Sequence, residues 1–360
     1  MFRRTAETLT LAAAGGIAFG LTGVPGGYLS GSILVVAAAA LAGRPMLVPV
    51  PLARVIFVLL GIWLGSVMTP DMLDGMAKYP VSIVVLIVAM TCIGVACAIY
   101  LQIVHKWDRV SAYLASAPGG MSQALVVAAE VGADLRAIAI VQSMRVVIIA
   151  VGLPSGLSLL GLTSQAVRPA GSPMTWASLN EFAVLGVAAV VGAAVFHRLR
   201  FPGGLMFGAM FASGVLHGTG LVQAVLPWWA TSTAAIALGG IIGARFANMP
   251  MRLFAHFIGA AVGSFAVAVI IVALFGAAVV RWMDLPAAEV MIAFAPGSVD
   301  AMMLLALALH LDPVYVGAHH VVRIFYVVLA TPFMVQREAG KVKTPADTSV
   351  PEAMQSPLDE

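Results

Sequence analysis

The sequence predicts an all-α integral membrane protein with two inverted repeats, about ten transmembrane helices and two re-entrant or broken segments. Three observations support this fold class: the composition, a repeated order of motifs, and the distribution of Lys and Arg. The chain has 360 residues, of which 61% are hydrophobic and only 10% charged, whereas soluble domains carry about 25% charged residues. So few charges cannot cover a water-facing surface, and hydrocarbon is therefore the expected solvent for most of the chain.

Apolar runs divide the chain into twelve elements, several of them shorter than the roughly 20 residues that a spanning helix needs. They are 8–24, 26–42, 52–69, 80–104, 112–130, 136–154, 178–197, 203–218, 228–245, 254–280, 287–309 and 313–334. The first run follows Arg3 and Arg4 as a signal peptide would, but Glu7 is atypical of one. We predict that this run is a retained helix.

An internal repeat is the most specific feature of the sequence. Ala117-Pro118-Gly119-Gly120 matches Ala295-Pro296-Gly297-Ser298 at a spacing of 178 residues. The same spacing pairs Asp134 with Asp312, Arg145 with Arg323, Pro154 with Pro332, Gly61 with Gly239 and Gly65 with Gly243, and Pro25-Gly26-Gly27 matches Pro202-Gly203-Gly204 at 177. This order predicts a duplication, with a first membrane repeat at 1–154, a linker at 155–177 and a second repeat at 178–335. The polar tail at 336–360 is expected to be disordered.

The distribution of Lys and Arg distinguishes two topologies. If all twelve runs span the membrane, 11 of the 19 Lys and Arg residues lie inside and 6 outside. If 112–130 and 287–309 instead enter the membrane and return, 14 lie inside and 3 outside, with Arg145 and Arg323 in the membrane. The positive-inside rule favours the second arrangement. Each half then has five spans, so the two halves are inverted, as in many secondary transporters.

The two Ala-Pro-Gly sequences are the first candidate site. Proline and glycine interrupt helices, and a helix that begins after each break would direct free N–H groups toward it. Two inverted copies would bring these ends together near the middle of the membrane, which favours an anionic group. The predicted solute-binding residues here are Pro118, Gly119, Gly120, Ser122, Gln123, Pro296, Gly297, Ser298 and Asp300. A kinked helix with a Ser or Asp cap is the structural alternative.

The second candidate is Arg145 and Arg323, with Gln142 and His320 one turn before them. Arginine within an apolar helix is costly, so each should face the interior and have a partner. An anion clamp is one interpretation, with His as a proton carrier. A structural ion pair is the other, for example Arg145 with Glu130 or Arg323 with Asp300. Because His319 and His320 are adjacent, they lie about 100° apart on a helix and cannot both face one site.

The remaining chemistry-bearing residues indicate structural roles. Asp134 and Asp312 precede predicted helices and are expected to cap them. Cys92 and Cys97 lie in one apolar run, where packing is the expected role. The sequence contains no nucleotide-binding loop, GxSxG, HExxH or kinase motif, and its seven His are scattered. The prediction is therefore a protein that is not an enzyme, with no cofactor and no metal site. The net charge of +3 comes without a basic run, so no nucleic acid is expected.

These motifs resemble those of the AbrB-type membrane protein family. The resemblance rests on PGG at 25–27 and 202–204, APGGMSQ at 117–123, GAD at 132–134 and VQSMR at 141–145, and covers about residues 8–335. It implies a duplicated membrane domain. Members are often labelled ammonia monooxygenase or AbrB family regulator, and one has been linked to regulation of gene expression. The second copy departs from the motif, because Gly120 becomes Ser298 and Gln142 becomes His320.

Together these observations predict a secondary transporter of a small anionic solute in the bacterial inner membrane, multi-pass and with both termini cytoplasmic. The expected partners are the lipid bilayer and a small-molecule solute, and a homo-oligomer is left open. The alternative is a membrane-embedded protein that takes part in regulation of gene expression, as the family label implies. A third possibility, an intramembrane oxidoreductase, is disfavoured by the absence of clustered metal ligands. The sequence leaves the solute, the coupling ion and the direction of transport open.

Overall fold

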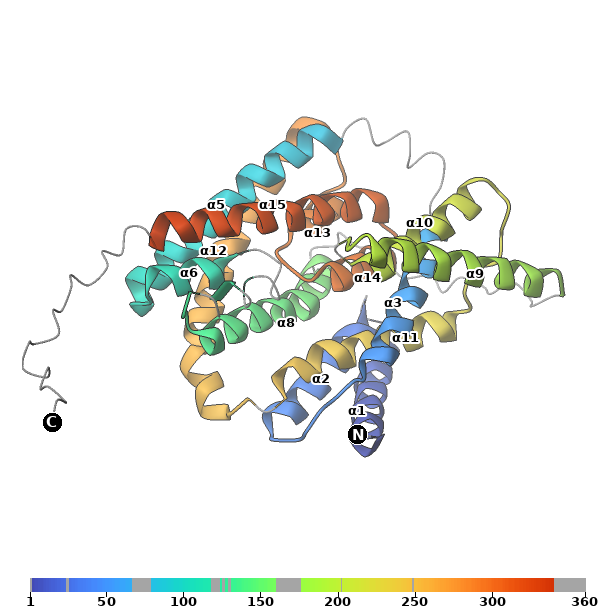
Figure 1. Ribbon diagram of the computed structural model, residues 1–360, viewed down its shortest axis with the longest axis horizontal. Helices are drawn as coiled ribbons and strands as arrows, with labels where there is room; N and C mark the ends of the chain where they lie inside the picture. Colours follow the sequence, from blue (N-terminus) through green and yellow to red (C-terminus); the bar gives the residue numbers. More distant parts are fainter. Residues whose placement is uncertain are drawn as a thin grey trace, which may run out of the picture.

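Figure 1 shows the computed structural model, which is helical throughout its described residues and has no strand among them. The described residues are 2–23, 26–66, 79–117, 124, 127–128, 131–159, 176–201, 203–247 and 249–339, without the side chains of 157–159, 176–178, 300, 328 and 331–339. The helices are α1 (Phe2–Leu21), α2 (Gly27–Leu41), α3 (Val50–Gly65), α5 (Tyr79–His105), α6 (Arg109–Ser116), α8 (Leu135–Leu159), α9 (Trp176–Arg198), α10 (Gly204–Gly218), α11 (Trp228–Gly243), η2 (Ala244–Phe246), α12 (Met251–Met283), α13 (Ala287–Phe294), α14 (Val299–Ala308) and α15 (Pro313–Ala339).

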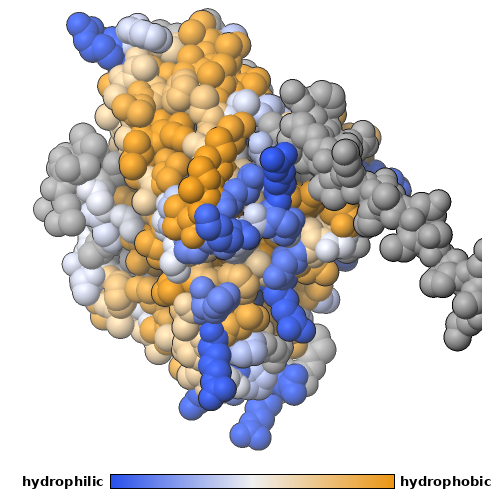
Figure 2. Space-filling view, turned by 90° about the vertical axis from the view of Figure 1, so that its left-hand side faces the viewer, coloured by the Kyte–Doolittle hydropathy of each residue, from blue (hydrophilic) through white to orange (hydrophobic). Residues whose placement is uncertain are grey.

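Several helices are suited to a lipid environment. Within the described residues, four are long and apolar enough to cross a membrane: Tyr79–His105, Leu135–Gly156, Leu179–Arg198 and Met251–Met283. Large apolar side chains of α9 and α12 are exposed, among them Val187, Val190 and Leu274. Figure 2 shows apolar residues over much of one face, with hydrophilic residues gathered toward its centre and lower part. Water would not accommodate so much exposed apolar surface, so the chain is an all-helical, membrane-embedded protein.

The helices pack in two groups. One contains α1, α2, α3, α9, α10 and α11, and the other contains α5, α6, α8, α12, α13, α14 and α15 (Figure 1). The groups meet where α2 packs on α8 and where α14 packs on α3. The largest apolar core crosses this boundary, since it includes Leu29 and Leu60 from the first group and Leu86 and Leu305 from the second. The candidate arginines both lie in the second group.

The Pro-Gly-Gly motif has the same local role in both halves. Gly26 and Gly203 precede α2 and α10 with positive φ values of 68° and 66°, a conformation that glycine adopts without strain. The next glycine allows a close approach of helices: a Cβ at Gly27 would lie 2.7 Å from the carbonyl oxygen of Phe19. Glycine at these two places is therefore required by the turn and by the helix contact that follows it.

α5 and α12 pack against each other in opposite directions. The Cys97 thiol donates to the carbonyl oxygen of Ser264 at 3.1 Å. Further along α5, a Cβ added at Gly259 would lie 3.5 Å from the His105 ring. As the residue number rises along α5 it falls along α12, so the end of α5 lies beside the beginning of α12. This direction bears on the orientation of the two halves.

In each of two segments of the chain, the last residues lie beside the first. The backbone N–H of Asp134 donates to the Ser111 hydroxyl at 3.0 Å, so the start of α8 lies beside the start of α6. The backbone N–H of Asp312 donates to the Glu289 carboxylate at 3.3 Å, which places the start of α15 beside the start of α13. A segment that crossed the whole membrane would have its ends about 30 Å apart.

The element expected at 287–309 consists of two short helices. α13 ends at Phe294 and α14 begins at Val299, and the non-helical residues between them are the Ala295–Ser298 motif. The prediction of a broken segment is therefore confirmed for this element. In the first half α6 ends at Ser116, and residues 118–123 lie outside the described residues.

The predicted apolar run 136–154 was followed by a linker, yet α8 continues to Leu159 with Pro154 inside it. A proline within a helix leaves the carbonyl four residues earlier without its N–H partner. That carbonyl belongs to Ala150, and it accepts a hydrogen bond from the Ser30 hydroxyl of α2 at 3.0 Å. A neighbouring helix thus supplies the missing donor, which sequence periodicity does not reveal.

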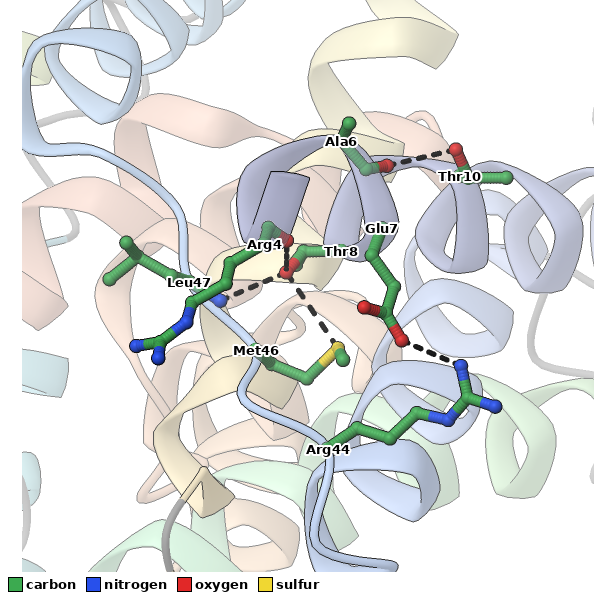
Figure 3. A network of polar contacts seen from close by, with 8 residues as sticks. All are labelled: Arg4, Ala6, Glu7, Thr8, Thr10, Arg44, Met46 and Leu47. Atoms are coloured by element: carbon green, nitrogen blue, oxygen red, sulfur yellow. Dashed lines mark hydrogen bonds and ion pairs between the residues drawn. The ribbon is translucent and has the colours of Figure 1, made fainter. Parts of the chain in front are cut away.

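The first turns of α1 are bound to the connection between α2 and α3 (Figure 3). Arg44 Nη1 and Glu7 Oε1 form an ion pair at 2.6 Å. The Thr8 hydroxyl accepts from the backbone N–H of Leu47 at 2.9 Å and lies 2.8 Å from the Arg4 carbonyl oxygen, to which it donates. The N-terminal arginines and Arg44 therefore lie at the same end of the protein, as the predicted topology requires.

Candidate site: two buried arginines at the helix breaks

Arg145 on α8 and Arg323 on α15 are the two charged side chains at the centre of the candidate site. Their side chains are almost completely buried, with 2% and 1% of their surface exposed. In the described residues neither arginine has an ion-pair partner. The predicted acidic partners were Glu130 and Asp300, and the side chains of both lie outside the described residues.

Each arginine binds main-chain carbonyl groups where a short helix ends. Arg323 Nη1 and Nη2 donate to the carbonyl oxygens of Ala295 and Gly297 at 2.5 and 2.7 Å. Arg145 Nη1 donates to the carbonyl oxygen of Ala117 at 3.2 Å. The last carbonyls of a helix have no intrahelical partner and carry partial negative charge, so a guanidinium group satisfies them well. Sequence reasoning missed these partners, because no side-chain pattern marks them.

The residues one turn before the arginines make a second matching pair of contacts. Gln142 Nε2 donates to the carbonyl oxygen of Leu114 at 2.8 Å. His320 Nε2 lies 3.2 Å from the carbonyl oxygen of Ile292. Both the donors and the acceptors are 178 residues apart, the spacing of the sequence motifs. The contacts at the ends of α6 and α13 are therefore nearly the same despite the change from Gln to His.

Three buried nitrogen atoms at this site have no hydrogen-bond partner among the described residues: Arg145 Nε, Arg323 Nε and His320 Nδ1. The two arginines lie on connected elements, because α15, which carries Arg323, packs on α6, and α8, which carries Arg145, packs on α14. An unsatisfied buried polar atom is costly, and charged donors more so. The site thus presents two free N–H donors and a ring nitrogen in a positively charged, buried setting.

The other predicted site residues are distributed around this centre. Pro296 and Gly297 are buried in the second break, and Ser298 caps α14 by accepting from the backbone N–H of Ala301 at 3.3 Å. The backbone of Asp300 lies in the first turn of α14. The remaining predicted residues, Pro118, Gly119, Gly120, Ser122 and Gln123, lie outside the described residues.

Asp134 and Asp312 cap the helices that carry the arginines, as expected. Asp134 Oδ1 accepts from the backbone N–H groups of Arg136 and Ala137, each at 3.0 Å. Asp312 Oδ1 accepts from Val314 at 2.8 Å and from Tyr315 at 3.1 Å. These caps satisfy N–H groups that would otherwise lack a partner at the helix starts.

We expect Asp134→Ala to lower the free energy of unfolding by about 1 kcal/mol, because two N–H groups at the start of α8 lose their acceptor. Unfolding in detergent at increasing denaturant concentration measures this change. Asp134→Asn is the control, since its side-chain oxygen can still cap the helix. Equal stability of the alanine variant and the native protein would show that the cap contributes nothing.

A polar cluster beside the site was not predicted. His319 Nε2 lies 2.8 Å from the Ser82 hydroxyl of α5, and its Nδ1 lies 2.7 Å from the carbonyl oxygen of Tyr315. The Tyr79 hydroxyl donates to Asp312 Oδ2 at 2.8 Å. His319 therefore contacts α5 while His320 contacts α13, as their angular separation on a helix predicted. Ser and Tyr at the start of an apolar helix are too common to identify this cluster from the sequence.

Comparison with known proteins identifies the family to which the chain belongs. The family model described as "Transition state regulatory protein AbrB" matches residues 6–338, which includes both arginines and both breaks. The chain belongs to the AbrB family. Two relatives of this AbrB family protein match most of its length. One, "Uncharacterized protein YhjN" of Bacillus subtilis (strain 168), is 25% identical over 354 residues, 90% of each chain. The other, "Putative regulator AbrB" of Escherichia coli (strain K12), is 25% identical over 279 residues, covering 76% of this chain and 79% of the relative.

Proposed function

We propose that this AbrB family protein is a secondary transporter of a small anionic solute, with about ten spanning helices in two inverted repeats and both termini cytoplasmic. The observation that carries the proposal is the pair of buried arginines, each with an Nε–H group that has no partner among the described residues. The solute would bind between the two breaks, where Arg145 and Arg323 hold the helix ends in place.

The inverted arrangement is supported by the directions of equivalent helices. The bounds of α3 and α11 differ by 178 residues at both ends, as do those of α6 and α13. By the same spacing α5 corresponds to α12, and these two helices run in opposite directions. Parallel copies would place equivalent helices in the same direction. The short segments that begin and end together, from α6 to Asp134 and from α13 to Asp312, also favour re-entrant segments over full spans.

Electrostatics favours an anion as the missing partner. Two guanidinium groups buried near each other lose hydration and repel, and carbonyl dipoles compensate only part of that cost. Carboxylate, sulfate and phosphate groups accept charge-assisted hydrogen bonds from arginine, and a free Nε–H beside an occupied Nη is a suitable donor. The competing interpretation is purely structural, with each arginine serving only to bind the end of a short helix.

An anion-binding measurement on the purified protein separates these interpretations. Thermal shift detects binding of sulfate, nitrate, lactate and succinate, and uptake into proteoliposomes then tests transport of any anion that binds. We expect Arg145→Gln and Arg323→Gln to reduce binding by at least about tenfold, because each removes a charged donor worth about 1.5–3 kcal/mol. Arg44→Gln is the matched control, since Arg44 is exposed and paired with Glu7.

Size-exclusion chromatography of each variant shows whether it remains folded. If a folded Arg145→Gln variant binds the anion as well as the native protein, or if none of the panel binds to the native protein, the proposal is wrong.

The proposal also includes three expectations: no enzymatic activity, a lipid bilayer and a small solute as partners, and no nucleic-acid partner. The regulatory alternative is supported by the names of the family and of one relative, both of which refer to a regulator. Co-purification of one defined cytoplasmic protein, lost on loop mutation, would favour it.

A further inference from the structure

We propose that His320 binds a proton together with the anion, so that this protein couples anion transport to protons. This inference rests on the proposed anion site and names its coupling ion. The starting point is an asymmetry: the residue equivalent to His320 in the first half is Gln142, which makes the same carbonyl contact but cannot take up a proton. The fold therefore does not require a titratable group at this position.

Hydrogen bonding assigns the protons on the His320 ring. Nε2 faces the carbonyl oxygen of Ile292, which can only accept, so Nε2 carries a hydrogen. In the neutral ring Nδ1 then has a bare lone pair. Nδ1 is buried and has no donor among the described residues, and the whole side chain is 0% exposed. A buried acceptor without a donor indicates that the site is incomplete until a proton or another donor arrives.

Charge explains why the proton and the anion bind together. An imidazolium next to Arg323 in an apolar setting is costly while the site holds only positive charge. An anion at the two Nε–H groups offsets that charge, and protonation makes the buried Nδ1 a further donor, one helical turn from Arg323. The proton comes from hydronium in the surrounding water: as its O–H bond breaks, the Nδ1–H bond forms and a water molecule is left. Because linkage is reciprocal, the proton must strengthen anion binding as much as the anion strengthens proton binding.

The surroundings of His320 contain groups of both signs. The titratable and charged residues nearest to it on the packed elements come from six elements. They are Asp312, Tyr315, His319, Arg323 and Tyr326 on or before α15, Arg145 on α8, Glu289 on α13, Tyr79 and Cys97 on α5, and Arg109 and Tyr113 on α6, while the Asp300 side chain of α14 lies outside the described residues. The positive charges are the arginines, and Glu289 lies one turn before Ile292. Glu289 and Asp312 are half-buried and joined through the Asp312 backbone N–H, which places two acidic groups at the start of α15, the helix that carries His320.

The test measures anion affinity at about pH 6 and about pH 8, on either side of the usual range for histidine. Sulfate and lactate are the probes, because neither titrates in this interval. We expect the native protein to bind its anion about tenfold more tightly at the lower pH, since one linked proton changes affinity by at most tenfold per pH unit. Binding in weakly buffered solution with a pH indicator should also take up about one proton per anion.

His320→Gln is the decisive variant, because it reproduces the residue and carbonyl contact of Gln142. We expect its affinity at about pH 6 to fall to the native value at about pH 8, with no proton uptake. His217→Gln is the matched control: His217 also contacts main-chain carbonyls, of Ser213 and Ala224, but lies on α10 away from the arginines. It should retain the native pH dependence.

The outcomes distinguish the two proposals. Anion binding of equal strength at both pH values in the native protein would overturn proton coupling and leave the anion site intact. A His320→Gln variant with the full native pH dependence would also overturn it. Failure of sulfate, lactate and the rest of the panel to bind at either pH would overturn the anion site, and the proton inference with it.

Discussion

Gly208→Ala should destabilise the protein by about 1–3 kcal/mol or more, because the added methyl group would overlap backbone rather than a movable side chain. A Cβ at Gly208 would lie 2.2 Å from the carbonyl oxygen of Gly192 and 2.9 Å from the Cα of Ala193. α9 and α10 would have to move apart, and their close contact is the kind that small residues make possible in membrane helices. Thermal unfolding of the purified variant in detergent measures the loss.

Gly186→Ala is the matched control for this substitution. Gly186 lies inside α9, and a Cβ there would meet nothing within 4 Å. Alanine is favoured over glycine in a helix by about 1 kcal/mol, so this variant should be as stable as the native protein or more stable. If both alanine variants unfold alike, the close packing of α9 on α10 does not determine the stability of the protein.

Cysteine labelling should place Arg136 and Arg281 on opposite sides of the membrane. Arg136 is in the first turn of α8, beside the start of α6, and Arg281 is near the end of α12. α5 has 27 residues, and its end lies beside the start of α12, so its beginning lies toward the end of α12, where Arg281 is. At about 1.5 Å per residue, the two ends of α5 are about 40 Å apart. We expect a membrane-impermeant maleimide to label Arg136→Cys from the cytoplasm and Arg281→Cys from outside.

The labelling needs a background without the native thiols, such as Cys92→Ser with Cys97→Ala, because Cys92 is exposed. Arg44→Cys and Lys78→Cys are the controls, since the twelve-span and re-entrant arrangements both place the first inside and the second outside. Labelling of Arg136→Cys from outside and of Arg281→Cys from the cytoplasm would support twelve spans. That result would contradict the inverted repeats.

Much of the architecture could be predicted from the sequence because it depends on local composition. Hydrophobic length and the scarcity of charge indicate apolar helices, and all the described helices correspond to predicted runs. The Ala-Pro-Gly motif indicated a broken element, since proline and glycine act on the backbone within a few residues. The cost of burying arginine likewise predicted that Arg145 and Arg323 would face the interior.

Other features depend on contacts between distant segments. Pro154 stays within α8 because Ser30, 124 residues earlier in the chain, donates to the carbonyl that the proline leaves without a partner. The arginines bind main-chain carbonyl groups, and every residue type carries a carbonyl, so the sequence gives no signal for these acceptors.

The sequence by itself determined that this chain is a membrane protein, that the element at 287–309 is broken and which two arginines lie inside the protein. Only the tertiary structure decided what those arginines hold, and that an Nε–H group of each and the Nδ1 of His320 are left without partners among the described residues. The physical reason is that hydrophobicity and backbone restrictions act locally, whereas hydrogen-bond satisfaction is settled only when separate helices come together.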